Sequence, residues 1–100
     1  MQKRSLTPIN PTISSGSSET LLAANQSRTY LLIRNSTAAN ILIGLNGQAL
    51  AGIVPTLANP GLVLKADEWY ESTDETCPTG IITVYQTSGR NTNLISVMEA

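Results

Sequence analysis

Turn-forming residues interrupt this sequence at short intervals, and the spacing of these turns constrains the fold more than any other feature. The segments between the turns are roughly 5–7 residues long, which suits β-strands and is too short for most helices. Helical spacing of apolar residues is poor; residues 47–57 come nearest, and Gly52 and Pro55 limit that segment to a turn at most. The pattern predicts six or seven strands, at residues 20–24, 29–34, 40–45, 62–66, 69–71, 81–86 and 93–99.

We therefore predict an all-β fold, a compact antiparallel β-sandwich or small barrel of six to seven strands. The chain of 100 residues leaves room for one domain with a modest core. We expect residues 19–100 to form the sandwich and residues 1–18 to form an extended N-terminal arm. The apolar side chains of the arm are Leu6, Ile9 and Ile13.

Pro8 and Pro11 suit an arm that lies along a sheet edge or on the surface of a partner, whereas a frayed terminus is the alternative. The strands at 29–34, 40–45 and 62–66 carry apolar residues on both faces. A strand with one solvated face would alternate between apolar and polar residues. These strands therefore need cover on their outer face, either from the chain itself or from another subunit.

The sequence lacks most of the groups that carry enzyme chemistry. It contains no histidine, so the usual general base and the usual neutral metal ligand are missing. Cys77 is the only cysteine, which excludes an internal disulfide and a cysteine-rich zinc site. No glycine-rich phosphate loop is present. We expect a protein that is not an enzyme and that binds no cofactor and no metal.

Charge and hydropathy disfavour two classes of partner. The formal net charge is −1 and the six basic residues are scattered, so binding to nucleic acid through a basic stripe is not expected. No apolar run approaches the ~20 residues of a membrane span, and the basic N-terminus is not followed by the apolar run of a signal peptide. Charged residues make up only 13% of the chain, which suits a surface covered by neighbours in an assembly.

Three features around the strands could contact a partner. Adjacent Trp69 and Tyr70 must point to opposite faces of their strand, so one should fill the core while the other lies outside it. The outer ring either enters a partner's pocket or only packs on the surface, and stacking on a sugar is the less favoured alternative. Arg34 lies on the same face as Leu32 and is either a surface arginine or one member of an intersubunit ion pair. An acidic stretch is either a solvated loop or a docking site, and it contains Asp67, Glu68, Glu71, Asp74 and Glu75.

One segment carries a resemblance to a known group of proteins. Residues 20–35 read TLLAANQSRTYLLIRN, which resembles the hairpin that opens the β-sandwich of small bacteriophage virion proteins. A later turn, Pro78-Thr79-Gly80, followed by an apolar strand, also resembles that group. The resemblance implies a head decoration (cement) protein that binds the major capsid protein and other copies of itself, often as trimers. It also implies a place in the virion, assembled in the host cytoplasm.

If this holds, we expect Leu6, Ile9 and Ile13 of the arm to contact the shell, with Trp69, Tyr70, Glu71 and Arg34 as further partner-binding residues. A head fibre base, a neck protein or a tail adaptor would share this chemistry. A carbohydrate-binding β-sandwich module is the alternative from a different class, and it would depend on Trp69 or Tyr70.

Overall fold

The computed structural model describes residues 9–47, 50, 61–87 and 90–100. Within these residues the chain forms seven strands, a single short 3-10 turn and no α-helix. The strands are β1 (Glu19–Leu22), β2 (Tyr30–Asn35), β3 (Ile41–Gly44), β4 (Leu62–Leu64), β5 (Trp69–Thr73), β6 (Ile82–Tyr85) and β7 (Ile95–Glu99), and the 3-10 turn η1 spans Asp74–Thr76.

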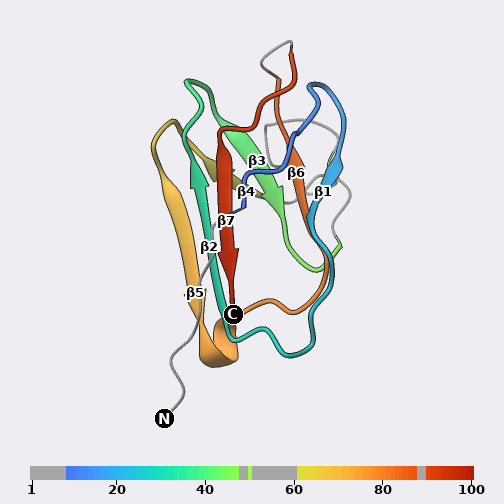
Figure 1. Cartoon of the computed structure of the whole chain (residues 1–100), viewed down its shortest axis with the longest axis vertical. Coiled ribbons are helices and arrows are strands. Elements are labelled where there is room, and N and C mark those ends of the chain that lie inside the picture. The colour runs from blue at the N-terminus through green and yellow to red at the C-terminus, as the bar shows by residue number, and fades with distance from the viewer. Residues whose placement is uncertain (1–8, 48–49, 51–60, 88–89) are drawn as a thin grey trace.

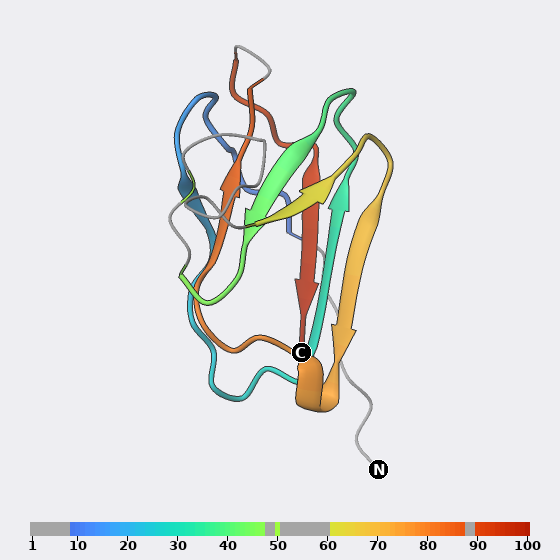
Figure 2. The ribbon, with the colours of Figure 1, turned by 180° about the vertical axis from the view of Figure 1, so that it is seen from behind.

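The strands pair into two antiparallel sheets. One sheet has four strands in the order β1-β6-β3-β4, and the other has three in the order β5-β2-β7. Figures 1 and 2, which view the molecule from opposite sides, show the three-stranded sheet lying over the four-stranded one. The prediction of an all-β sandwich is confirmed, and each strand begins and ends within two residues of its predicted limits.

The core lies between the two sheets and is built from alternate residues of the strands. β2 contributes Leu31 and Ile33, and β3 contributes Ile41 and Ile43 from the opposite layer. All four are at most 1% exposed, because a period of two places successive side chains on opposite faces of a strand. Further fully buried core residues are Ile82, Val84, Ile95 and Val97.

The strands with apolar residues on both faces differ in how their outer face is covered. Leu42 points away from the core cluster, yet it is fully buried within the single chain. Gly61 lies against it, and a Cβ added at Gly61 would come 2.8 Å from the Leu42 Cγ atom. The chain itself therefore covers this face of β3. Leu32, on the outer side of β2, stays partly exposed.

The described part of the predicted arm begins at the free edge of β7 and continues past Thr92 to the end of β6, where the backbone N–H of Gly16 donates to the carbonyl of Gln86 (2.8 Å). Ile9 and Val97 exchange two backbone hydrogen bonds of 2.9 Å, and Ile13 and Thr92 exchange two more of 2.8 and 2.9 Å. Ile13 is 1% exposed and belongs to the core, so it offers no surface to a partner, in contrast to what we predicted. Ile9 is 47% exposed. Leu6 lies outside the described residues.

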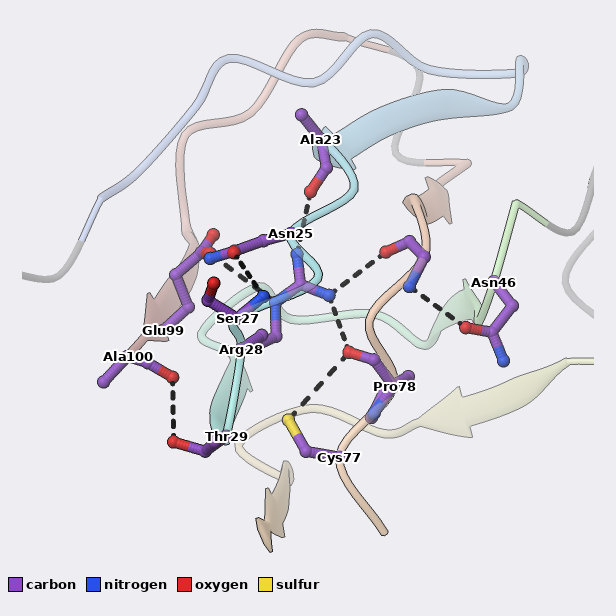
Figure 3. Close-up of polar contacts among 11 residues, drawn as sticks. Ala23, Asn25, Ser27, Arg28, Thr29, Asn46, Cys77, Pro78, Glu99 and Ala100 are labelled. Atoms are coloured by element: carbon purple, nitrogen blue, oxygen red, sulfur yellow. Dashed lines mark hydrogen bonds and ion pairs between the residues drawn. The ribbon is translucent and has the colours of Figure 1, made fainter. Parts of the chain in front are cut away.

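A buried arginine closes one end of the sandwich (Figure 3). The guanidinium of Arg28 donates hydrogen bonds to the carbonyls of Pro78 (2.7 Å), Gly80 (3.1 Å) and Ala23 (2.8 Å). Its Nε atom lies 3.5 Å from a carboxylate oxygen of Glu99. One side chain, 2% exposed, thus joins the β1–β2 connection, the β5–β6 connection and the last strand.

A buried asparagine closes the opposite end. The side-chain amide of Asn35 donates to the carbonyls of Ala39 (2.7 Å), Leu64 (2.9 Å) and Lys65 (3.2 Å). Its oxygen accepts bonds from the backbone N–H and the hydroxyl of Thr37. Because unsatisfied polar groups are costly to bury, these bonds fix the β2–β3 turn to the β4–β5 corner.

We predict that replacing Arg28 by methionine destabilises the fold strongly. Arg28→Met keeps most of the apolar stem but leaves three loop carbonyls without their donor and removes the ion pair with Glu99. The loss should be roughly 3 kcal/mol in the free energy of unfolding, measured by urea denaturation. The matched control is Lys65→Met, an exposed cation that should change stability by less than ~0.5 kcal/mol. Equal effects of the two variants would contradict the role of Arg28.

Candidate interaction face

The outer side of the three-stranded sheet presents a set of side chains that no other part of the described chain covers completely. Because Leu31, Ile33 and Asn35 of β2 are buried, the alternate residues Tyr30 and Arg34 point outward with Leu32. Their register neighbours on β5 and β7 point to the same side. We call this set the outer sheet face; it comprises Tyr30, Leu32, Arg34, Trp69, Glu71, Thr73, Ser96 and Met98.

Trp69 is the most prominent member of the outer sheet face. Trp69 is 64% exposed, whereas Tyr70 next to it is partly buried and packs against the core. The two rings therefore lie on opposite sides of β5, as their adjacency predicts. An indole ring of this exposure is unusual in a domain whose other large apolar side chains are mostly buried, and aromatic rings of this kind are enriched at binding interfaces.

A shallow hollow lies on the same face, between β2 and β7. Its volume is about 250 Å³, and its walls come from Leu32, Arg34, Ser96, Val97 and Met98. Most of its lining is apolar, with the Arg34 side chain at one side. Trp69 on β5 is the register partner of Arg34 on the neighbouring strand β2, and Arg34 lines the hollow. The exposed ring and the hollow therefore belong to one continuous surface.

Charges of both signs surround the exposed ring. Arg34 is exposed beside Trp69, and Glu71 is exposed two residues further along β5. Asp67 and Glu68 precede the strand and line a second small hollow together with Trp69. The outer sheet face therefore combines the apolar side chains Trp69, Leu32 and Met98 with a cation on the central strand and a carboxylate on an edge strand. Aromatic residues, methionine and arginine are enriched in protein–protein contacts.

Tyr30 and Glu71 form a hydrogen bond across two strands of this face. The Tyr30 hydroxyl donates to a Glu71 carboxylate oxygen at 2.7 Å. This bond raises the pKa of the Tyr30 hydroxyl above its ordinary value, because the neutral phenol is the form that donates; burial and the carboxylate charge act in the same direction. The bond keeps the Glu71 side chain over the sheet.

The structure brings together three of the residues predicted to bind a partner, Arg34, Trp69 and Glu71. It separates Tyr70, Ile9 and Ile13 from them. Tyr70 faces the core, and Ile9 lies at the far edge of β7. The sequence places Leu32 on the face of Arg34 but does not predict that it binds a partner, and it does not predict a role for Met98. The period of two in a strand would have placed both on this face once the alternate residues of β2 and β7 were assigned to the core.

Potential metal-ligating side chains are not gathered into one site in the part of the chain that the structure describes. The described residues contain no group of three or more histidine, cysteine, aspartate or glutamate side chains that could hold a metal ion. Cys77 is buried, with its sulfur 3.9 Å from the carbonyl oxygen of Pro78. No helix in the described ranges is long and apolar enough to cross a membrane.

Comparison of the chain with protein-family models, with curated proteins and with solved structures found no match.

We predict that the Tyr30 phenolate appears at higher pH than an ordinary tyrosine and that Glu71→Gln lowers this pH. A raised pKa in the folded state means that the contribution of the bond to stability is complete below the ordinary tyrosine pKa and is lost as pH rises through the raised one. The ultraviolet difference between the wild type and Tyr30→Phe isolates this phenolate. Glu75→Gln, at an exposed carboxylate in η1, is the control and should leave the titration unchanged.

Proposed function

We propose that this chain is a non-enzymatic structural protein of a bacteriophage virion. Within that class we propose a capsid decoration protein that binds the outside of the assembled head and stabilises it. The observation that carries the proposal is the outer sheet face, on which Trp69 is 64% exposed. Both ends of the sandwich are closed by buried hydrogen bonds of Arg28 and Asn35. The sequence likeness of residues 20–35 to a segment of small bacteriophage virion proteins supports the same class.

The prediction that residues 20–35 form a hairpin is wrong for this chain, because β1 pairs with β6 in one sheet and β2 pairs with β5 and β7 in the other. The polar residues of this segment nevertheless stabilise the fold. Asn25 donates a 2.7 Å hydrogen bond to Glu99 and accepts one from the backbone of Ser27. Arg28 and Asn35 close the two ends of the sandwich. These residues of the motif make hydrogen bonds that stabilise the fold, and a motif with this role is compatible with a protein that acts by assembly.

Binding to a repeating shell would not need a strong single contact. Many weak contacts repeated over a lattice add up to stable attachment through a high effective concentration. We propose that the major capsid protein is contacted by the N-terminal segment, with Leu6 and the exposed Ile9, and that the outer sheet face meets neighbouring copies. No cofactor, nucleic acid or membrane has a part in this proposal, and the place of action is the virion, assembled in the host cytoplasm.

A head fibre base, a neck protein or a tail adaptor would use the same contacts at a different position. These differ from decoration in copy number, since a decoration protein is present in hundreds of copies and a neck ring in roughly a dozen. Counting copies in intact particles by quantitative mass spectrometry separates them.

One observation favours a carbohydrate-binding module as a second candidate, namely the hollow that Trp69 forms with Asp67 and Glu68. A sugar could stack on the ring while the carboxylates accept its hydroxyl hydrogens. Glycan-array binding that is lost in Trp69→Ala would support this function, and an empty array would remove it.

We predict that deleting residues 2–8 weakens binding to heads assembled without this protein. The deletion removes Leu6 and keeps the Ile9–Val97 and Ile13–Thr92 bonds. Cosedimentation with such heads should show a loss of at least ~10-fold in affinity, which corresponds to about 1.4 kcal/mol. Ile9→Ser tests the exposed neighbour of the deleted segment.

A deletion that extends to residue 13 is not a usable variant, because it removes a core residue that is 1% exposed. Urea denaturation of the shorter deletion must match the wild type before the binding result is interpreted. Undiminished attachment of a stable deletion variant would exclude the N-terminal segment from the contact with the shell.

A further inference from the structure

The outer sheet face carries both a projecting ring and a hollow. Trp69 projects from β5, and the hollow of about 250 Å³ lies between β2 and β7. We propose that two copies of this chain pair through their outer sheet faces about a two-fold axis, with Trp69 of each copy seated in the hollow of the other. This inference rests on the proposed function, in which the outer sheet face contacts neighbouring copies of the chain.

The register of the three strands makes the contact reciprocal. Trp69, Arg34 and Ser96 form one row across β5, β2 and β7, and Glu71, Leu32 and Met98 form the next. Strands lie about 4.8 Å apart, so the ring and the far wall of the hollow belong to positions roughly 10 Å apart. A two-fold axis that runs along β2 exchanges β5 with β7. It therefore brings the ring of each copy over Ser96 and Met98 of the other.

The chemistry of the contact is that of two packed sheets. Leu32, on the central strand, would meet its own counterpart near the axis, and Met98 would lie against the indole ring, a favourable sulfur–aromatic contact. Both side chains are partly exposed in the single chain. Pairing would remove them and the 64% exposed Trp69 from water together, so one rotation buries two copies of every apolar group.

Charge selects a second copy as the occupant. The face carries the cation Arg34 on β2 and the carboxylate Glu71 on β5, with Asp67 and Glu68 just before that strand. The exchange of strands places Glu71 of each copy over β7 of the other, on the strand next to the other's Arg34. These opposite charges offset the approach of the two Arg34 side chains. A single face thus supplies its own complement in shape and in charge.

The test measures the mass of the full chain in solution as a function of concentration. Trp69 is the only tryptophan in the sequence, so its fluorescence reports directly on the contact. We expect sedimentation equilibrium to show a monomer–dimer equilibrium, accompanied by a blue shift of the emission as the protein associates. Trp69→Ala should weaken the association at least ~10-fold, as expected for a central aromatic anchor.

A second variant keeps the test independent of the ring itself. Ser96→Tyr fills the hollow and leaves Trp69 in place, so it should also weaken the dimer and cancel the concentration-dependent shift of emission. Ile81→Ala is the matched control: this apolar side chain is 41% exposed but lies outside the outer sheet face, and its loss should leave the dimer unchanged. Urea denaturation at a concentration where all forms are monomeric confirms that each variant folds.

A monomer at every concentration, a stable trimer, or a dimer that Trp69→Ala and Ser96→Tyr leave unchanged would overturn the two-fold pairing. Attachment to heads is measured separately with the same proteins. A monomeric wild type that still decorates heads overturns the pairing and leaves the proposed function in place. A dimer of the expected behaviour that is absent from virions supports the pairing and overturns the proposed function.

Discussion

A guanidinium group withdrawn from water holds the two layers of this domain together at one end. Arg28 satisfies carbonyls from two connections that are about fifty residues apart in the chain and also faces Glu99 at the end of β7. Buried backbone carbonyls need donors, and a guanidinium holds several N–H donors in a fixed planar arrangement, so one side chain serves three carbonyls here. Gly80 completes this corner, because a Cβ there would come 2.7 Å from the Asn46 Cα atom.

Asn35 performs the equivalent task at the far end of β2, so the central strand of the smaller sheet is anchored at both ends. The residues between these anchors alternate between the core and the outer sheet face. Leu32 and Arg34 are therefore presented from a backbone with little freedom to rearrange. A surface that is already ordered loses less entropy on binding, which favours specific contacts over a small area.

Much of this architecture could be predicted from the sequence, because strand positions and the opposite orientation of Trp69 and Tyr70 follow from a period of two. Ile13 could not be placed correctly, since a lone apolar residue among serines and prolines carries no periodicity. Its burial depends on pairing with Thr92, far along the chain. The role of Arg28 was equally hidden, because sequence patterns show which side a residue faces and not which distant carbonyls it meets.

The bonds of Ile9 to Val97 in β7 and of Ile13 to Thr92 just before it also affect how this sheet can extend. One edge of the three-stranded sheet is occupied by the chain's own backbone, whereas β5 pairs with β2 alone among the described residues. A sheet that is open on both edges can add strands without limit and grow into fibres. A sheet with a single open edge can join one neighbour and then stops. The domain can therefore expose the outer sheet face at high local concentration, while repeated addition of strands at the edges of this sheet is restricted.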